Sequence, residues 1–276
     1  VDQGQKWDRT LMVSIFHHYL ELTRQAVAQA DGHPAVVVWP ETASPALLQT
    51  DEPARQLIAE AAGGATALVG SVRFDDAERP RNSLFALGAN GTIEAIYDKW
   101  HLVPFGEYQP DWLPLGIQVV PGGGFASGPG PRTLHIPGIP PVGVLICYEA
   151  IFSHEGIDEA GRPDWMVNVT NDAWFGNSAG PRQHLAAARM RAVEEGLPLM
   201  RAANTGISVG FDAKGHELGR LGMQKSGVLS VHLPAPIVLP LYARVGLLLP
   251  GGVAVLALVA GLLGKPVGKR GRPANF

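Results

Sequence analysis

The sequence predicts a layered α/β domain, in which helices cover the faces of β-sheets. Short apolar runs rich in valine, isoleucine and leucine recur along the chain and are bounded by glycine and proline, as is typical of buried strands. Segments with helical spacing of apolar residues are intermixed with these runs. A composition of 46% hydrophobic and 17% charged residues is ordinary for a globular protein of this length.

The expected elements occupy the first 235 residues. We expect helices over 7–30, 55–62 and 183–195. We expect strands over 35–41, 65–74, 83–91, 92–99, 142–149 and 165–172, and a hairpin over 207–219. The Asn90-Gly91 pair predicts the turn between the strands over 83–91 and 92–99. A long loop rich in glycine and proline, over 121–131, has the length of a lid or binding loop.

The C-terminal segment differs from the rest. Residues 245–264 form a run of 20 positions without a charge, about the length of a helix that crosses a bilayer core. A basic tail follows over 265–276, and such tails face the cytoplasm. A buried core helix, weakened by Pro250 and the two glycines after it, is the alternative. The basic flank favours a membrane helix within 236–264, a catalytic domain over 1–235 on the periplasmic side and a cytoplasmic tail over 265–276.

Composition also limits the classes of partner. The net charge of −3 gives no reason to expect a nucleic-acid partner. The only cysteine, Cys147, excludes an internal disulfide. His17 and His18 are adjacent and would point in different directions on a helix, which makes them a poor ligand pair. We therefore expect no metal and no cofactor.

Three reactive side chains come at or just after the ends of expected strands: Glu41, Lys99 and Cys147. Such positions form the crevice in many α/β proteins. Glu41 could remove the thiol proton of Cys147, and Lys99 could stabilise the oxyanion formed when the sulfur attacks a carbonyl. Each residue also has a structural alternative: an inert core cysteine, a glutamate beside a helix N-cap and a solvated hairpin lysine.

The motifs around these residues narrow the choice. WPETASP at 39–45, YDKWHLVPFGEY at 97–108 and ICYEAIF at 146–152 occur in this order, and NDAWFG at 171–176 and LYARVG at 241–246 follow. Together they resemble the nitrilase superfamily and, within it, the apolipoprotein N-acyltransferase family. The resemblance covers nearly the whole chain and implies a nitrilase-like α-β-β-α layered sandwich. That family carries a bundle of membrane helices ahead of this domain; none precedes it in this sequence, so we expect a fragment or a shortened product.

The resemblance implies a role for each matched residue. Glu41 would be the general base, Lys99 the oxyanion stabiliser and Cys147 the nucleophile, while Glu107 would be a further acid near the site. Tyr148 and Glu149 match the family's CYE motif. On a strand of period two, Glu149 would share a face with Cys147 and orient groups such as Lys99.

The implied reaction is a two-step acyl transfer at a bacterial inner membrane. A phospholipid would acylate Cys147, and the N-terminal amine of a diacylglyceryl apolipoprotein would accept the acyl chain. Because both substrates are lipids, we expect Trp112, Trp174 and Phe175 to lie at the membrane interface. For Trp174 a position in the core is an equal alternative.

Two other functions remain as alternatives. A soluble nitrilase-type carbon–nitrogen hydrolase (an amidase) would use the same three residues with water as acceptor; the apolar C-terminus and the HLVPFGE stretch argue against it. A non-catalytic, membrane-attached binding module would not explain why Glu41, Lys99 and Cys147 occur together in their motifs.

Overall fold

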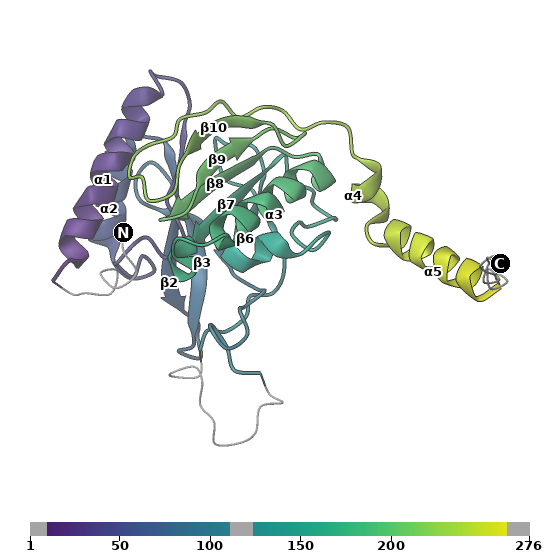
Figure 1. Cartoon of the computed structure of the whole chain (residues 1–276). Helices are drawn as coiled ribbons and strands as arrows, with labels where there is room; N and C mark the ends of the chain where they lie inside the picture. Colours follow the sequence, from purple (N-terminus) through teal and green to yellow (C-terminus); the bar gives the residue numbers. More distant parts are fainter. Residues whose placement is uncertain (1–9, 111–123, 264–276) are drawn as a thin grey trace, which may run out of the picture.

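The computed structural model describes residues 10–110 and 124–263, and its two β-sheets pack face to face with helices outside them (Figure 1). The first sheet has four strands in the order β1-β2-β3-β4, with bounds Val36–Val38, Thr66–Phe74, Pro80–Leu87 and Ile93–Asp98. The second has six strands in the order β10-β9-β8-β7-β6-β5. Their bounds, from β5 to β10, are Thr133–Leu134, Val142–Ile146, Trp165–Asn171, Leu199–Asn204, Ser208–Phe211 and Glu217–Leu221.

A core of aliphatic side chains joins the two sheets. Leu68 and Leu84 of the first sheet lie in one buried cluster with Val144, Ile146 and Val167 of the second. Apolar area removed from water in this way stabilises a sandwich by about 25 cal/mol per Å². β6, β7 and β8 pair in parallel, so their carboxyl ends meet at one edge of the second sheet.

The outer faces of the sheets carry the helices. α1 (Met12–Gln29) and α2 (Glu52–Ala62) pack on the first sheet, where Leu20 and Ile58 share a buried cluster with Phe85. α3 (Gly180–Glu195) packs on the second sheet, where Ala188 meets Leu145 in a separate cluster. The order of layers is therefore helix, sheet, sheet, helix, which confirms the predicted α-β-β-α sandwich.

Local sequence explains where the helices begin and end. The Asp51 side chain accepts a hydrogen bond from the N–H of Ala54 at the start of α2, and Pro53 occupies the first turn. α2 ends at Gly63 and α3 at Gly196, whose φ angles of 58° and 64° lie in the left-handed region that glycine adopts at low cost.

The strand expected over 142–149 is shorter than predicted. β6 ends at Ile146, and Cys147 has a φ of 50° that an extended strand does not allow. A 3₁₀ helix, η2 (Cys147–Ile151), follows at once, so Glu149 does not sit on a strand of period two and that prediction was wrong. β5 and β8 were not expected; β8 carries Arg201 and Asn204, which hide its strand pattern in the sequence.

The C-terminal segment also needs a correction. Two helices, α4 (Leu241–Val245) and α5 (Leu248–Leu263), replace the continuous helix expected over 245–264. Gly246 separates them with a φ of 51°, and a Cβ there would lie 2.5 Å from the His154 ring. Among the described residues, no helix has both the length and the apolarity to cross a membrane, so the predicted transmembrane helix is not supported. α5 projects away from the sandwich (Figure 1).

We predict that Leu68→Ala lowers the free energy of unfolding by about 2–5 kcal/mol, because it leaves a cavity in the core between the sheets. Leu57→Ala is the matched control, since Leu57 lies on α2 with 42% of its surface exposed. Urea unfolding followed by circular dichroism measures both. Equal losses for the two variants would contradict the assignment of this core.

Candidate active site

Glu41 lies just beyond the carboxyl end of β1, and its carboxylate is 6% exposed. Its Oε1 accepts a hydrogen bond from Asn82 Nδ2 at 2.7 Å, and its Oε2 accepts one from the backbone N–H of Asn171 at 2.8 Å. Gly70 on β2 passes so close that a Cβ would lie 2.2 Å from the Pro40 carbonyl oxygen and 2.9 Å from Glu41 Cα. Because Gly70 has no side chain, the backbone of Glu41 can lie this close to β2.

Lys99 follows the last residue of β4, and its side chain is 1% exposed. Its Nζ lies 3.4 Å from Glu41 Oε1 and 2.8 Å from Glu107 Oε2. The Val103 backbone N–H donates to Glu107 at 2.9 Å and fixes that carboxylate from its own loop. The structure thus brings Glu41, Lys99 and Glu107 into direct contact.

Cys147 begins η2, directly after β6, and is partly buried against the core between the sheets. Burial, and the negative charge of Glu41, raise the pKa of its thiol to about 12, although Lys99 and a hydrogen bond with Thr170 oppose the increase. The thiol therefore rests protonated and needs a base when it reacts.

The charge of Lys99 depends on its acidic neighbours. Burial alone would lower the pKa of the ammonium, but the negative charges of Glu41 and Glu107 outweigh this cost and raise it above its ordinary value. An ammonium has three donors, and the two carboxylates occupy two of them. Within the described part of the chain, these two carboxylates are the hydrogen-bond partners of Lys99 Nζ.

Comparisons with known proteins identify the family of this chain and proteins that share its fold. The family model described as "Carbon-nitrogen hydrolase" matches residues 5–238. The chain belongs to the carbon–nitrogen hydrolase family. A relative named "Apolipoprotein N-acyltransferase" from Rhodopseudomonas palustris is 41% identical over 95% of this chain and 52% of its own length. The chain thus spans about half the length of the curated relatives it matches.

Solved structures share the fold of this carbon–nitrogen hydrolase chain. A carbon–nitrogen hydrolase from Helicobacter pylori G27 aligns with a TM-score of 0.61 at 15% identity, covering 76% of this chain and 80% of that one. An amidase from Nesterenkonia sp. AN1, which carries acrylamide added at its active-site cysteine, aligns with a TM-score of 0.57 at 22% identity. That alignment covers 79% of this chain and 88% of the amidase.

Glu149 has a different position from the one expected. Its Oε2 accepts the N–H of Ile146 at 2.6 Å, and its Oε1 accepts the N–H of Trp100 at 2.8 Å and the hydroxyl of Tyr97 at 3.0 Å. It ties the start of η2 to the chain just after Lys99, so its contact with Lys99 is indirect. Burial raises the pKa of Glu149 to about 7, against these hydrogen bonds.

Sequence reasoning missed two asparagines of the site. Asn82 on β3 is 3% exposed, and its Nδ2 donates to Glu41 and also to Glu107 Oε1 at 3.1 Å. Asn171 ends β7 and donates its backbone N–H to Glu41. Their position is the signal that could have indicated them. Asn82, within RNS, lies on the strand that pairs with the one before Lys99, and Asn171, within VTND, lies on the strand that pairs with the one before Cys147.

The aromatic residues expected at a lipid interface have different outcomes. Trp174 is 74% exposed, so the alternative of a core position is wrong, and Phe175 is 44% exposed. Both belong to η3 (Asp172–Phe175), directly after Asn171. Tyr148 packs edge-on against Phe152 with ring centroids 5.0 Å apart. Trp112 lies outside the described residues.

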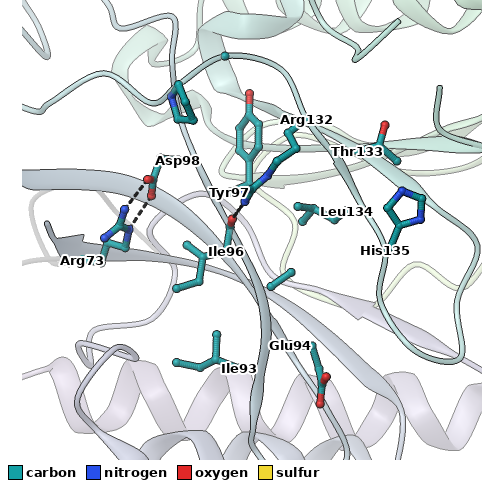
Figure 2. Close-up of a pocket in the computed structure, with 13 residues that line it drawn as sticks. Arg73, Ile93, Glu94, Ile96, Tyr97, Asp98, Arg132, Thr133, Leu134 and His135 are labelled. Atoms are coloured by element: carbon teal, nitrogen blue, oxygen red, sulfur yellow. Dashed lines mark hydrogen bonds and ion pairs between the residues drawn. The ribbon is translucent and has the colours of Figure 1, made fainter. Parts of the chain in front are cut away.

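A cavity lies along β4 (Figure 2), and Glu41, Lys99 and Cys147 are not among the residues that line it. It has a volume of about 680 Å³ and lies between β4 and residues 129–135. The Arg73–Asp98 ion pair lines it, and Arg132 donates to the Ile96 carbonyl beside it. Since neither Glu41 nor Cys147 reaches this cavity, we do not assign the chemistry to it.

We predict that Glu41→Gln makes Cys147 react faster with iodoacetamide at pH 8, because this reagent reacts with the thiolate already present at equilibrium. The substitution removes the negative charge that contributes most, after burial, to the raised pKa of the thiol. Labelling rates followed by intact-mass spectrometry measure this effect. Glu107→Gln is the control and should give a smaller increase, because Glu107 raises the same pKa less. Slower labelling of Glu41→Gln would contradict the electrostatic description.

We predict that wild-type stability decreases between about pH 4.5 and pH 7 relative to Glu149→Gln. The carboxyl pKa is raised from 4.5 to about 7 by folding, so the folded state holds a proton in this window that the unfolded state has lost. The expected decrease in the free energy of unfolding across this window is on the order of 3 kcal/mol. Urea unfolding at several pH values tests it, and parallel curves for the two proteins would show that Glu149 is not the group responsible.

Proposed function

We propose that this chain catalyses transfer of an acyl group from a phospholipid to an amine through a thioester on Cys147. The observation that carries the proposal is the contact between Glu41 and Lys99 at 3.4 Å, just past the ends of β1 and β4, together with the effect of both charges on the thiol of Cys147, which follows β6. The pKa of the thiol responds to Glu41, Lys99 and Glu107, which supports their action as a unit. The name of the relatives, apolipoprotein N-acyltransferase, supports the choice of donor and acceptor.

In the first step Glu41 takes the thiol proton while the sulfur of Cys147 bonds to the ester carbonyl carbon of the phospholipid. The carbonyl oxygen becomes an oxyanion, and the third N–H of Lys99 stabilises it. When the oxyanion collapses, the carbon–oxygen bond to the glycerol breaks. Glu41 returns the proton to this leaving oxygen, so that a lysophospholipid departs and an acyl-thioester remains.

In the second step the N-terminal amine of a diacylglyceryl apolipoprotein attacks the thioester carbon. Glu41 takes a proton from the amine, Lys99 again faces the oxyanion, and the carbon–sulfur bond breaks. The proton returns to the sulfur, which regenerates Cys147. One carboxylate serves both steps because the departing and arriving groups use the same face of the site.

Lipid substrates require a site that meets a membrane surface. The exposure of Trp174 and Phe175 beside Asn171 supports contact with lipid on this side. α5 adds a run of exposed apolar side chains, among them Leu248 at 81% and Leu262 at 76%. In a bacterium we place the domain at the periplasmic face of the inner membrane.

An amidase is the second candidate. The structural likeness to the amidase from Nesterenkonia sp. AN1 supports it, since the same residues would pass the acyl group to water instead of an amine. The exposed Trp174 favours the lipid substrate, because a small amide needs no apolar surface at the entrance.

We predict that incubation with phosphatidylethanolamine vesicles adds one acyl mass to the protein and that Cys147→Ser removes this adduct. Glu41→Gln and Lys99→Met should slow adduct formation by at least about 100-fold, since each removes a group that acts in the transition state. Intact-mass spectrometry measures all of them.

Glu94→Gln, an exposed carboxylate on β4, serves as the matched control and should leave the rate unchanged. Acylation by simple amides but not by phospholipid would identify the amidase instead. Turnover by Cys147→Ser at the wild-type rate would refute both.

A further inference from the structure

His184 on α3 contacts the backbone of the nucleophile. Its Nε2 lies 2.9 Å from the Cys147 carbonyl oxygen, and its Nδ1 lies 2.9 Å from Asp172 Oδ1. The ring is 5% exposed, and the ring of Phe175 stands edge-on to it at 6.1 Å. No step of the proposed reaction uses this imidazole.

The hydrogen-bond partners of the ring hold it in one orientation. A backbone carbonyl oxygen only accepts hydrogen bonds, so Nε2 donates to the Cys147 carbonyl oxygen. Burial raises the pKa of Asp172, but the hydrogen bond with His184 and the charge of Arg201 outweigh it and hold that pKa below its usual value. An ionised carboxylate therefore faces Nδ1 from the other side of the ring.

Asp172 connects the ring to Arg201. It contributes Oδ1 to the ring and Oδ2 to Arg201 Nη2 at 2.8 Å. Arg201 Nη2 also stands 3.4 Å from Nδ1, farther from it than Asp172 Oδ1 at 2.9 Å. Arg201 donates as well to the side chain of Asn168 and to the Ile207 carbonyl. One carboxylate thus holds the ring in place from the side away from Cys147.

The carbonyl that His184 holds belongs to a strained residue. Cys147 has a φ of 50°, a region that is unfavourable for a non-glycine residue and that its surroundings must stabilise. Because the peptide bond is planar, fixing this carbonyl also fixes the N–H of Tyr148, in the first turn of η2. Both groups lie beside the sulfur.

Two further contacts connect this arrangement to the thiol. The Thr170 hydroxyl donates to Asp172 Oδ1 at 3.2 Å, and the same side chain hydrogen-bonds Cys147. Gly206 leaves the space that the Asp172 carboxylate fills, since a Cβ there would lie 2.1 Å from Asp172 Oδ2. The pair therefore reaches Cys147 by two routes. His184 binds the carbonyl oxygen of Cys147, and Asp172 accepts from Thr170, which hydrogen-bonds the Cys147 side chain.

We propose that His184, held by Asp172, is a positioning residue that fixes the main chain of Cys147 for attack on the acyl donor. The proposal rests on the proposed acyl transfer for its kinetic readout. Its structural readout, the order of η2, does not depend on any substrate.

The test compares His184→Leu with His184→Gln. Leucine cannot hold the carbonyl, so we expect kcat to fall about 100-fold with KM within threefold, as for other small misplacements of a reacting group. Glutamine can donate to the same carbonyl and should recover at least tenfold of the loss. A role in folding alone would lower the melting temperature without separating kcat from KM. A kcat of His184→Leu within threefold of wild type, or His184→Gln no better than His184→Leu, would overturn the proposal.

Hydrogen exchange gives the readout without substrate. In His184→Leu the amides of residues 146–152 should exchange at least tenfold faster, with β2 as an unchanged internal reference. If wild type forms no thioester but this difference appears, the proposed function fails and the positioning role stands. Equal exchange in wild type and His184→Leu overturns the positioning role.

Two further variants sharpen the result. Gly206→Ala displaces Asp172 without changing His184 and should give both effects; wild-type behaviour would overturn the part played by Asp172. His216 is the matched control, because it also pairs with an aspartate, Asp212, at 2.9 Å, but its side chain is 70% exposed. A His216→Leu variant should match wild type in both measurements, and an equal loss there would show that the effect does not depend on contact with Cys147.

Discussion

The site depends on the burial of one ammonium between two carboxylates. Removing the charge of Lys99 from water is costly, and the contacts with Glu41 and Glu107 repay the cost only at short distance. These three residues come from β1, from the end of β4 and from the loop after it, so the first sheet must form correctly before the charges can meet. Burial, together with the negative charge of Glu41, then keeps the thiol of Cys147 protonated.

The second sheet supplies Cys147 and the first supplies the charges. β6 delivers Cys147 through a sharp change of direction at Ile146, where Glu149 accepts the backbone N–H. The same Glu149 binds the N–H of Trp100, one residue beyond Lys99. A single buried carboxylate thus connects the residue that would attack with the residue that would stabilise the product of attack.

Much of this arrangement could be predicted from the sequence. The apolar runs around Val36, Leu68 and Val167 located three buried strands, because continuous β-branched and aliphatic residues are typical of strands covered on both faces. β8 could not be predicted in this way, since Arg201 on it is 3% exposed and is satisfied by Asp172. Charge pairing across elements has no local pattern in the chain.

The same reason explains the errors near the site. Period-two reasoning placed Glu149 beside Cys147 on a strand, but Cys147 has a φ of 50°. Its carbonyl oxygen is bound by His184 from α3, and Glu149 accepts the N–H of Ile146 at the start of η2. The C-terminal run was predicted from its composition, which cannot reveal that Gly246 turns the chain between α4 and α5. Motif resemblance located Glu41, Lys99, Glu107 and Cys147, and it was silent on Asn82 and His184.

Two glycines beside the site, Gly70 and Gly206, limit how the site can be redesigned. Gly70 and Gly206 contribute no functional group, yet a single methyl at either would collide with the chain that holds Glu41 or Asp172. The space at these two glycines therefore limits which substitutions the fold accepts near the site, in addition to the chemistry of the side chains. Engineers who redesign its specificity should treat those two hydrogens as part of the catalytic apparatus.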